Sequence, residues 1–133
     1  MDHETAFVKA FLASEKRARW SQYLTDAKRR KEILARMSVG LPFISELGTE
    51  VPGEQDFPME LEKLLQAKGA GATCHVIVDG LKMDGRDLPL SEALRAICMH
   101  ERAAILSCLP GRLAYYKPSS PGRGIILERP LAG

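Results

Sequence analysis

The fold is decided by a short stretch in the middle of the chain, TCHVIVD at residues 73–79. Its residues are largely β-branched and apolar on both alternating faces, which is typical of a strand buried inside a sheet. Further along the chain, a polar loop at residues 80–87 leads to a helix that begins near Leu90. Before the strand, a helix is predicted between Asp56, as its N-cap, and Gly69, as its C-terminal glycine.

Three strands are predicted to close the chain, at residues 103–109, 112–116 and 124–129. Pro110 and Gly111 mark a tight turn between the first two strands. A two-residue turn sets the register of this hairpin and therefore the face on which each side chain lies. One face would carry Leu106, Cys108, Leu113 and Tyr115, and the other Ile105, Ser107, Arg112, Ala114 and Tyr116.

The beginning of the chain is helical. Apolar residues recur at helical spacing within residues 4–38 and predict two or three helices, with Asp2 and the pair Thr25-Asp26 as N-cap signals. A short edge strand is predicted at residues 41–47, because a proline interrupts it, and a loop at residues 48–55.

These elements define an α+β fold class, with N-terminal helices followed by β-α-β-α-β-β-β. We expect a mixed sheet, because a helix that joins two neighbouring strands usually makes them parallel. The length fits a single domain over residues 1–133, in which the helical segment 4–38 packs on an α/β core at residues 41–129.

Composition excludes several classes of protein. The 133 residues are 45% hydrophobic and 27% charged, which is ordinary for a globular domain, and a net charge of +2 excludes a strongly polycationic protein. No stretch approaches the roughly 20 apolar residues of a membrane span, so we expect no membrane contact. The first residues, MDHE, are acidic where a signal peptide is basic, and the cysteine count is odd. We therefore expect a cytoplasmic protein with free thiols.

Two residues are candidates for catalysis, Cys108 before the tight turn as nucleophile and His75 on the central strand as its base, with His100 as the alternative base. Both residue types are also common in protein interiors, and burial is the simpler interpretation for Cys108. Cys74 and His75 point to opposite faces of their strand and cannot share one ion, so we predict no metal site. The glycines at 69–71 follow a helix and precede a strand, the reverse of a dinucleotide motif, so no cofactor is predicted.

Candidates for ligand binding lie around the C-terminal strands: Asp79, Arg112, Tyr116 and Arg123. Basic groups beside an aromatic ring suit an anionic ligand. Basic runs at residues 16–19 and 28–31 could contact phosphates, although interleaved acidic residues favour a solvated helix face and make nucleic acid an unfavoured partner.

The runs ATCHVIVDGLKMDGRDLPLSEAL (72–94), ILSCLPGRLAYY (105–116) and IILERP (125–130) resemble small bacterial proteins to which no activity is assigned. The resemblance covers most of the chain and includes the basic N-terminal segments RARWSQYL and KRRKEILARM. It implies a self-contained domain and supplies neither a catalytic residue nor a ligand.

The sequence therefore favours a small binding or regulatory module, with a small ligand or a protein as partner, over an enzyme. The first alternative is a small enzyme or anion-binding protein with its site on the C-terminal sheet. The second is nucleic-acid binding through the basic helices. The open edges of the sheet would also suit a homodimer.

Overall fold

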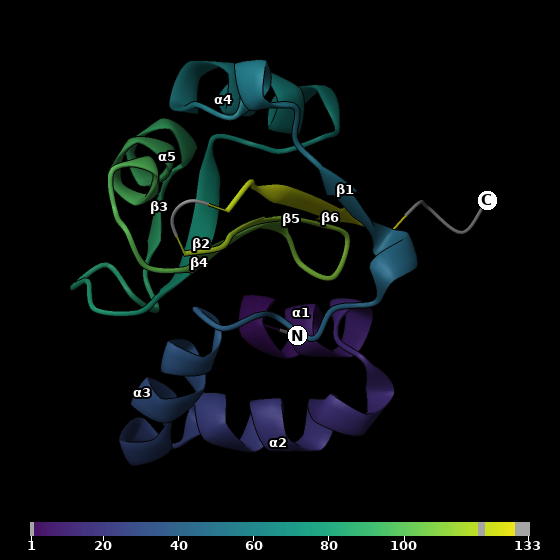
Figure 1. Cartoon of the computed structure of the whole chain (residues 1–133), viewed down its shortest axis with the longest axis vertical. Coiled ribbons are helices and arrows are strands. Elements are labelled where there is room, and N and C mark those ends of the chain that lie inside the picture. The colour runs from purple at the N-terminus through teal and green to yellow at the C-terminus, as the bar shows by residue number, and fades with distance from the viewer. Residues whose placement is uncertain (1, 120–121, 130–133) are drawn as a thin grey trace.

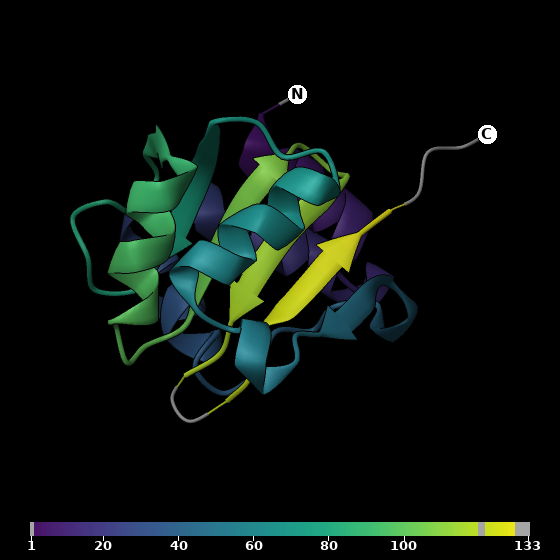
Figure 2. The ribbon, with the colours of Figure 1, turned by 90° about the horizontal axis from the view of Figure 1, so that it is seen from above.

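A computed structural model describes residues 2–119 and 122–129 and shows one α+β domain in three layers. A six-stranded sheet forms the middle layer, with α1, α2 and α3 on one face and α4 and α5 on the other (Figure 1, Figure 2). The helices are α1 (His3–Phe11), α2 (Ser14–Thr25), α3 (Ala27–Arg36), α4 (Pro58–Ala67) and α5 (Leu90–Cys98). The strands are β1 (Gly48–Glu50), β2 (Thr73–Val78), β3 (Asp87–Pro89), β4 (Ala104–Leu109), β5 (Leu113–Lys117) and β6 (Ile125–Glu128).

The sheet is antiparallel throughout, so the predicted mixed sheet is wrong. Its order is β1-β6-β5-β4-β2-β3, and every neighbouring pair is antiparallel. The cause is β3, a strand that the sequence did not predict, which folds back along β2. As a result α5 begins beside the start of β2, where the amide of Leu90 donates to the carbonyl of Ala72 (2.8 Å). The chain then enters β4 from the far end of β2, with Ala104 opposite Val78, and runs antiparallel to it.

The predicted strand at residues 41–47 is also displaced. Phe43 forms only an isolated bridge with Leu12, Ser45–Leu47 is a short 3-10 helix, and the strand lies at Gly48–Glu50, inside the predicted loop. The ring of Phe43 lies 2.6 Å from the position that a Cβ of Gly48 would occupy. Only a glycine therefore lets the chain pass this ring and enter the sheet.

The predicted faces of the C-terminal hairpin are confirmed although the turn is longer than two residues. Leu109 pairs with Leu113, and a bulge between Ser107 and Leu109 restores the alternation. The first predicted set of side chains lies in the core beneath α4 and α5, and the buried apolar members of the second set lie beneath α1, α2 and α3.

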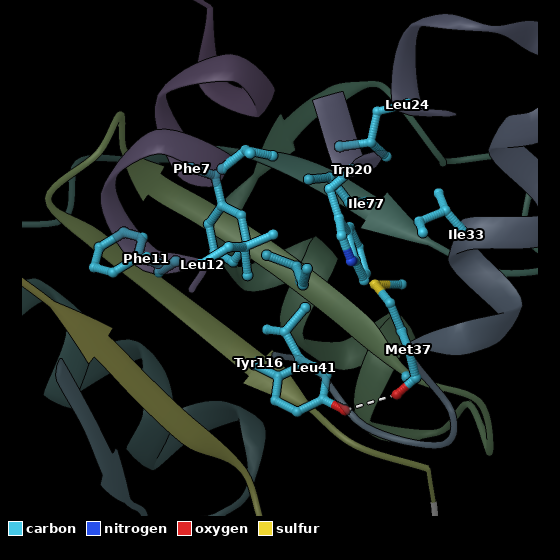
Figure 3. Close-up of a cluster of buried hydrophobic side chains, with 14 of the residues drawn as sticks. Phe7, Phe11, Leu12, Trp20, Leu24, Ile33, Met37, Leu41, Ile77 and Tyr116 are labelled. Carbon is cyan, nitrogen blue, oxygen red and sulfur yellow. Dashed lines mark hydrogen bonds between the residues drawn. The ribbon is translucent and has the colours of Figure 1, made fainter. Parts of the chain in front are cut away.

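Each face of the sheet has its own core. On the face of the N-terminal helices, Trp20, Met37 and Leu41 pack with Ile77, and the hydroxyl of Tyr116 donates to the carbonyl of Met37 (2.7 Å; Figure 3). The opposite core is formed by α4, α5 and the other face of the strands. The predicted N-terminal helices are confirmed. The carboxylate of Asp2 accepts from the amide of Thr5 (2.7 Å) and caps α1, and the carboxylate of Asp26 accepts from the amide of Lys28 (2.9 Å) and caps α3.

Asp56 does not cap α4, contrary to the prediction. The N-cap position is Phe57, which makes no side-chain cap, and the helix begins with Pro58. The carboxylate of Asp56 instead accepts from the hydroxyl of Tyr115 (2.7 Å) and from the amide of Gly124 (2.8 Å). It thereby joins the start of α4 to β5 and to the segment that enters β6.

None of the helices within residues 2–119 and 122–129 is long and apolar enough to cross a membrane.

The substitution Gly124→Ala tests the junction that Asp56 makes with Tyr115 and Gly124. A Cβ at position 124 would overlap the phenol oxygen and ring of Tyr115, so the side chain of Tyr115 must move away from Asp56. We expect the free energy of unfolding to fall by about 2 kcal/mol, the usual cost of forcing an extra methyl group into a packed site. Urea titration measures it. The control is Gly71→Ala, where a Cβ meets no atom within 4 Å and the loss should be under about 1 kcal/mol; equal losses would contradict the assignment.

Candidate functional site

The two candidate catalytic residues lie on opposite faces of the sheet. Cys108 is 6% exposed in the core beneath α4 and α5, together with Cys74, whereas His75 faces α1. His100 lies elsewhere, with its Nε2 2.8 Å from the carbonyl oxygen of Asp79. Within residues 2–119 and 122–129, no histidine therefore pairs with Cys108.

Burial keeps the thiols protonated. Desolvation raises the pKa of Cys74 and Cys108 to about 12 and that of Cys98 to about 11. The thiolate is the reactive form of cysteine, so none of these side chains is activated for nucleophilic attack at neutral pH.

Alkylation with iodoacetamide at neutral pH tests this conclusion. We expect Cys74 and Cys108 in the folded protein to react at least about 100-fold more slowly than in the urea-unfolded chain, because both are buried and protonated. Peptide mass spectrometry after timed quenching gives the rate at each cysteine. Rapid modification of Cys108 in the folded protein would contradict the buried assignment.

The four candidate ligand-binding residues are not brought together either. Arg112 is exposed in the β4–β5 turn, and Arg123 is exposed with its guanidinium 3.4 Å from Glu50. Tyr116 is buried against Met37. Asp79 follows β2 and lies 3.6 Å from Arg102. The four residues therefore lie in separate parts of the fold.

The polar side chains that the structure does gather lie around His75 on the face of β2 opposite Cys74. The Nε2 of His75 lies 2.7 Å from Oε2 of Glu4 in α1, and the Nδ1 lies 2.7 Å from Oδ1 of Asp87 in β3. Both ring nitrogens thus face carboxylate oxygens, which accept hydrogen bonds but cannot donate them when ionised. The arrangement is satisfied by the imidazolium form of His75.

Arg30 extends this network into α3. Its guanidinium donates to both oxygens of Glu4 (2.6 and 2.9 Å) and to both oxygens of Asp84 (2.8 and 3.0 Å). A further bond reaches the carbonyl of Leu24 (3.0 Å), and Asp84 also accepts from the amide of Val78 (3.0 Å). Arg30 belongs to the basic run at 28–31, but its side chain is mostly buried and paired with Glu4 and Asp84.

His3 covers the network from the N-terminal side. Its ring stacks on His75 with centroids 5.4 Å apart and planes inclined by 9°, and its Nδ1 lies 2.7 Å from the hydroxyl of Ser107. Burial and the neighbouring His75 lower the pKa of His3. Ser107 is only 1% exposed, so this serine and histidine form a structural contact rather than an accessible nucleophile.

A hollow of about 420 Å³ opens beside these groups. We call it the acidic hollow. Its lining includes the carboxyl side chains of Asp2, Glu4 and Asp87, the two stacked histidines, and the apolar side chains of Val8 and Leu24 from α1 and α2, together with hydroxyl groups. None of its described lining residues is a lysine or arginine.

The charges in the network shift one another's protonation. Burial opposes ionisation of Glu4, but hydrogen bonds from His75 and Arg30 lower its pKa to about 2. The hydrogen bond with Glu4 raises the pKa of His75, burial opposes this shift, and Asp87 adds to it. In the part of the chain that the structure describes, no group of three potential ligand side chains could hold a metal ion.

These shifts make stability depend on pH. Because its pKa is raised, His75 stabilises the fold fully below its ordinary value of 6.5, and this contribution is lost as the pH rises above 6.5 through the raised value. Glu4 acts in the opposite direction, and its contribution is lost as the pH falls from 4.5 towards about 2. We expect wild-type protein to lose stability relative to His75→Gln as the pH rises above 6.5 through the raised pKa of His75, measured by urea unfolding.

His3 also titrates and faces His75, so it needs its own control. Its lowered pKa has the opposite sign, because folding then favours the neutral ring and stability rises with pH. We therefore expect His3→Gln to keep the loss above pH 6.5 that His75→Gln removes. Parallel pH profiles for the wild type and His75→Gln would contradict the assignment of His75 as an imidazolium held between Glu4 and Asp87.

The sequence pointed to one member of this site, His75, and missed its partners. Glu4 lies 26 residues before Arg30 and Asp84 lies 54 residues after it, so no local pattern in the sequence relates them. The one available signal was the strand alternation that put His75 on the face opposite Cys74. It could not show which helix covers that face.

The chain forms a small α+β domain with a half-buried ionic network and an open hollow on one face of its sheet. Comparison with protein-family models, with curated proteins and with solved structures finds no match to this chain.

Proposed function

We propose that this protein is a small ligand-binding module and that the acidic hollow takes an organic cation with a compact apolar group. The observation that carries the proposal is the lining charge: three carboxyl side chains face the hollow, and no lysine or arginine is among its described lining residues. A volume of about 420 Å³ lies within the range of small-molecule sites.

The internal ion pairs leave a negative charge at the hollow. Arg30 and the imidazolium of His75 supply two positive charges against four carboxylates in and beside the hollow, those of Asp2, Glu4, Asp84 and Asp87. Asp87 has a side chain that is 72% exposed and contacts His75 through only one of its oxygens. An ammonium or guanidinium group can therefore approach Asp87 from solvent without breaking the network.

The apolar residues explain why the ligand should carry more than a charge. Val8 and Leu24 line the hollow and are 1% and 7% exposed, and nearby hydroxyl groups of Thr5, Ser21 and Thr25 offer hydrogen bonds. Few polar groups around an apolar wall are typical of sites that orient a small ligand. The proposed site shares only His75 with the residues that the sequence indicated.

Thermal unfolding with three matched compounds tests the proposal. We expect benzylammonium to raise the melting temperature, because binding to the folded state stabilises it. Benzyl alcohol has the same ring without the charge, and benzoate carries the opposite charge, so both should have little effect. Equal stabilisation by benzoate, or none by benzylammonium at about 10 mM, would contradict the proposal.

Two variants locate the binding. Asp87→Asn should weaken benzylammonium binding about fivefold in calorimetric or NMR titration, which is the effect expected of one largely exposed charge. Glu54→Gln removes an exposed carboxylate that is not part of the hollow and should leave the affinity unchanged. If both variants bind as the wild type does, the ligand occupies another site.

A further inference from the structure

A second hollow lies at the other end of the helical hairpin formed by α2 and α3. Its volume is about 540 Å³, and Lys16, Arg19 and Arg36 line it. We call it the basic hollow. Lys16 and Arg19 come from the first half of α2 and Arg36 from the end of α3, whereas the acidic hollow contacts the last residues of α2. The two hollows are therefore separate sites of opposite charge.

The three cations of the basic hollow are uncompensated. All three are exposed, and no ion pair involves any of them among the residues that the structure describes. No aspartate or glutamate appears in the described lining. Exposed like charges gathered around a concave surface attract a ligand of opposite charge.

The floor and wall between these cations are apolar. Trp20 and Leu41 line the hollow and belong to the core of this face (Figure 3), and Val39 stands beside them with 93% of its surface exposed. Covering a large exposed aliphatic side chain with a partner removes apolar surface from water and therefore favours binding. The ligand should therefore carry an apolar group as well as negative charge.

We propose that the basic hollow is a docking site for an acidic segment of a partner protein, with one aliphatic or aromatic side chain of that segment placed between Trp20, Leu41 and Val39. This inference is independent of the proposed cation site. The open, mostly apolar surface with cations at its margin fits a peptide, in which charged and apolar side chains alternate over a short length.

Nucleic acid fits the same surface less well. Several basic residues of α2 and α3 are used internally: Arg17 donates to the carbonyl of Leu12 (2.9 Å), Arg29 lies over the ring of Tyr23, and Arg30 is in the ionic network. The remaining cations do not form the long track that a phosphate backbone requires. Single-stranded DNA is therefore included as a competitor in the test.

The test uses a fluorescein-labelled ten-residue peptide with a central leucine-phenylalanine pair flanked by glutamates. Fluorescence anisotropy measures binding to the full chain, and Trp20 emission reports contact with the hollow. We expect binding that weakens with added salt. The double substitution Arg19→Gln/Arg36→Gln should weaken it about tenfold, and Val39→Ser about threefold.

The matched control is Lys28→Gln/Lys31→Gln, which removes the same charge from exposed positions at the start of α3 and should change affinity less than about twofold. Circular dichroism establishes that each variant is folded. The proposal is overturned if the peptide does not bind, if both double variants lose affinity equally, or if replacing the apolar pair by serines has no effect. Tighter binding of ten-residue oligothymidylate at the same salt concentration would favour a nucleic-acid site and would also overturn it.

Discussion

The arrangement of helices and loops around the acidic hollow depends on the ion pairs that the guanidinium of Arg30 makes with Glu4 and Asp84. This guanidinium joins α3 to α1 through Glu4 and to the β2–β3 loop through Asp84, and Asp84 in turn holds the amide of Val78 at the end of β2. Each charged hydrogen bond contributes about 2 kcal/mol when its partners are held in place. Removing the arginine would leave two half-buried carboxylates facing each other, so three segments distant in sequence share one stabilising contact.

Most elements of the fold followed from local patterns, and the topology did not. The helices at the N-terminus, the central strand and the faces of the C-terminal hairpin all depend on periodicity and turn residues that are visible in the sequence. The sheet polarity depends on Asp87–Pro89, a strand of three residues next to a loop. A strand this short shows no alternation, and its proline resembles the start of a helix. Its omission turned an antiparallel sheet into a predicted mixed one.

The site was less predictable than the fold because its members interact only after the helical layer is placed. His75 could be assigned to a face of β2, but the residue that covers it, Glu4, is 71 positions away. The basic run at 28–31 has the composition of a solvated helix face, and nothing in its spacing distinguishes Arg30 from its neighbours. Asp56 shows the same limitation, because an aspartate before a helix usually caps it, and here its carboxylate binds Tyr115 and Gly124 instead.

Both borders of the sheet are very short. The outermost strands, β1 and β3, have three residues each, and β3 ends in a proline. Few unpaired backbone groups are then presented at either side, and a proline supplies no donor. The longer strands, β2, β4, β5 and β6, which could template the addition of foreign chains, are enclosed in the interior of the sheet. The domain should therefore tolerate high concentration without fibril formation as long as these two short borders stay attached.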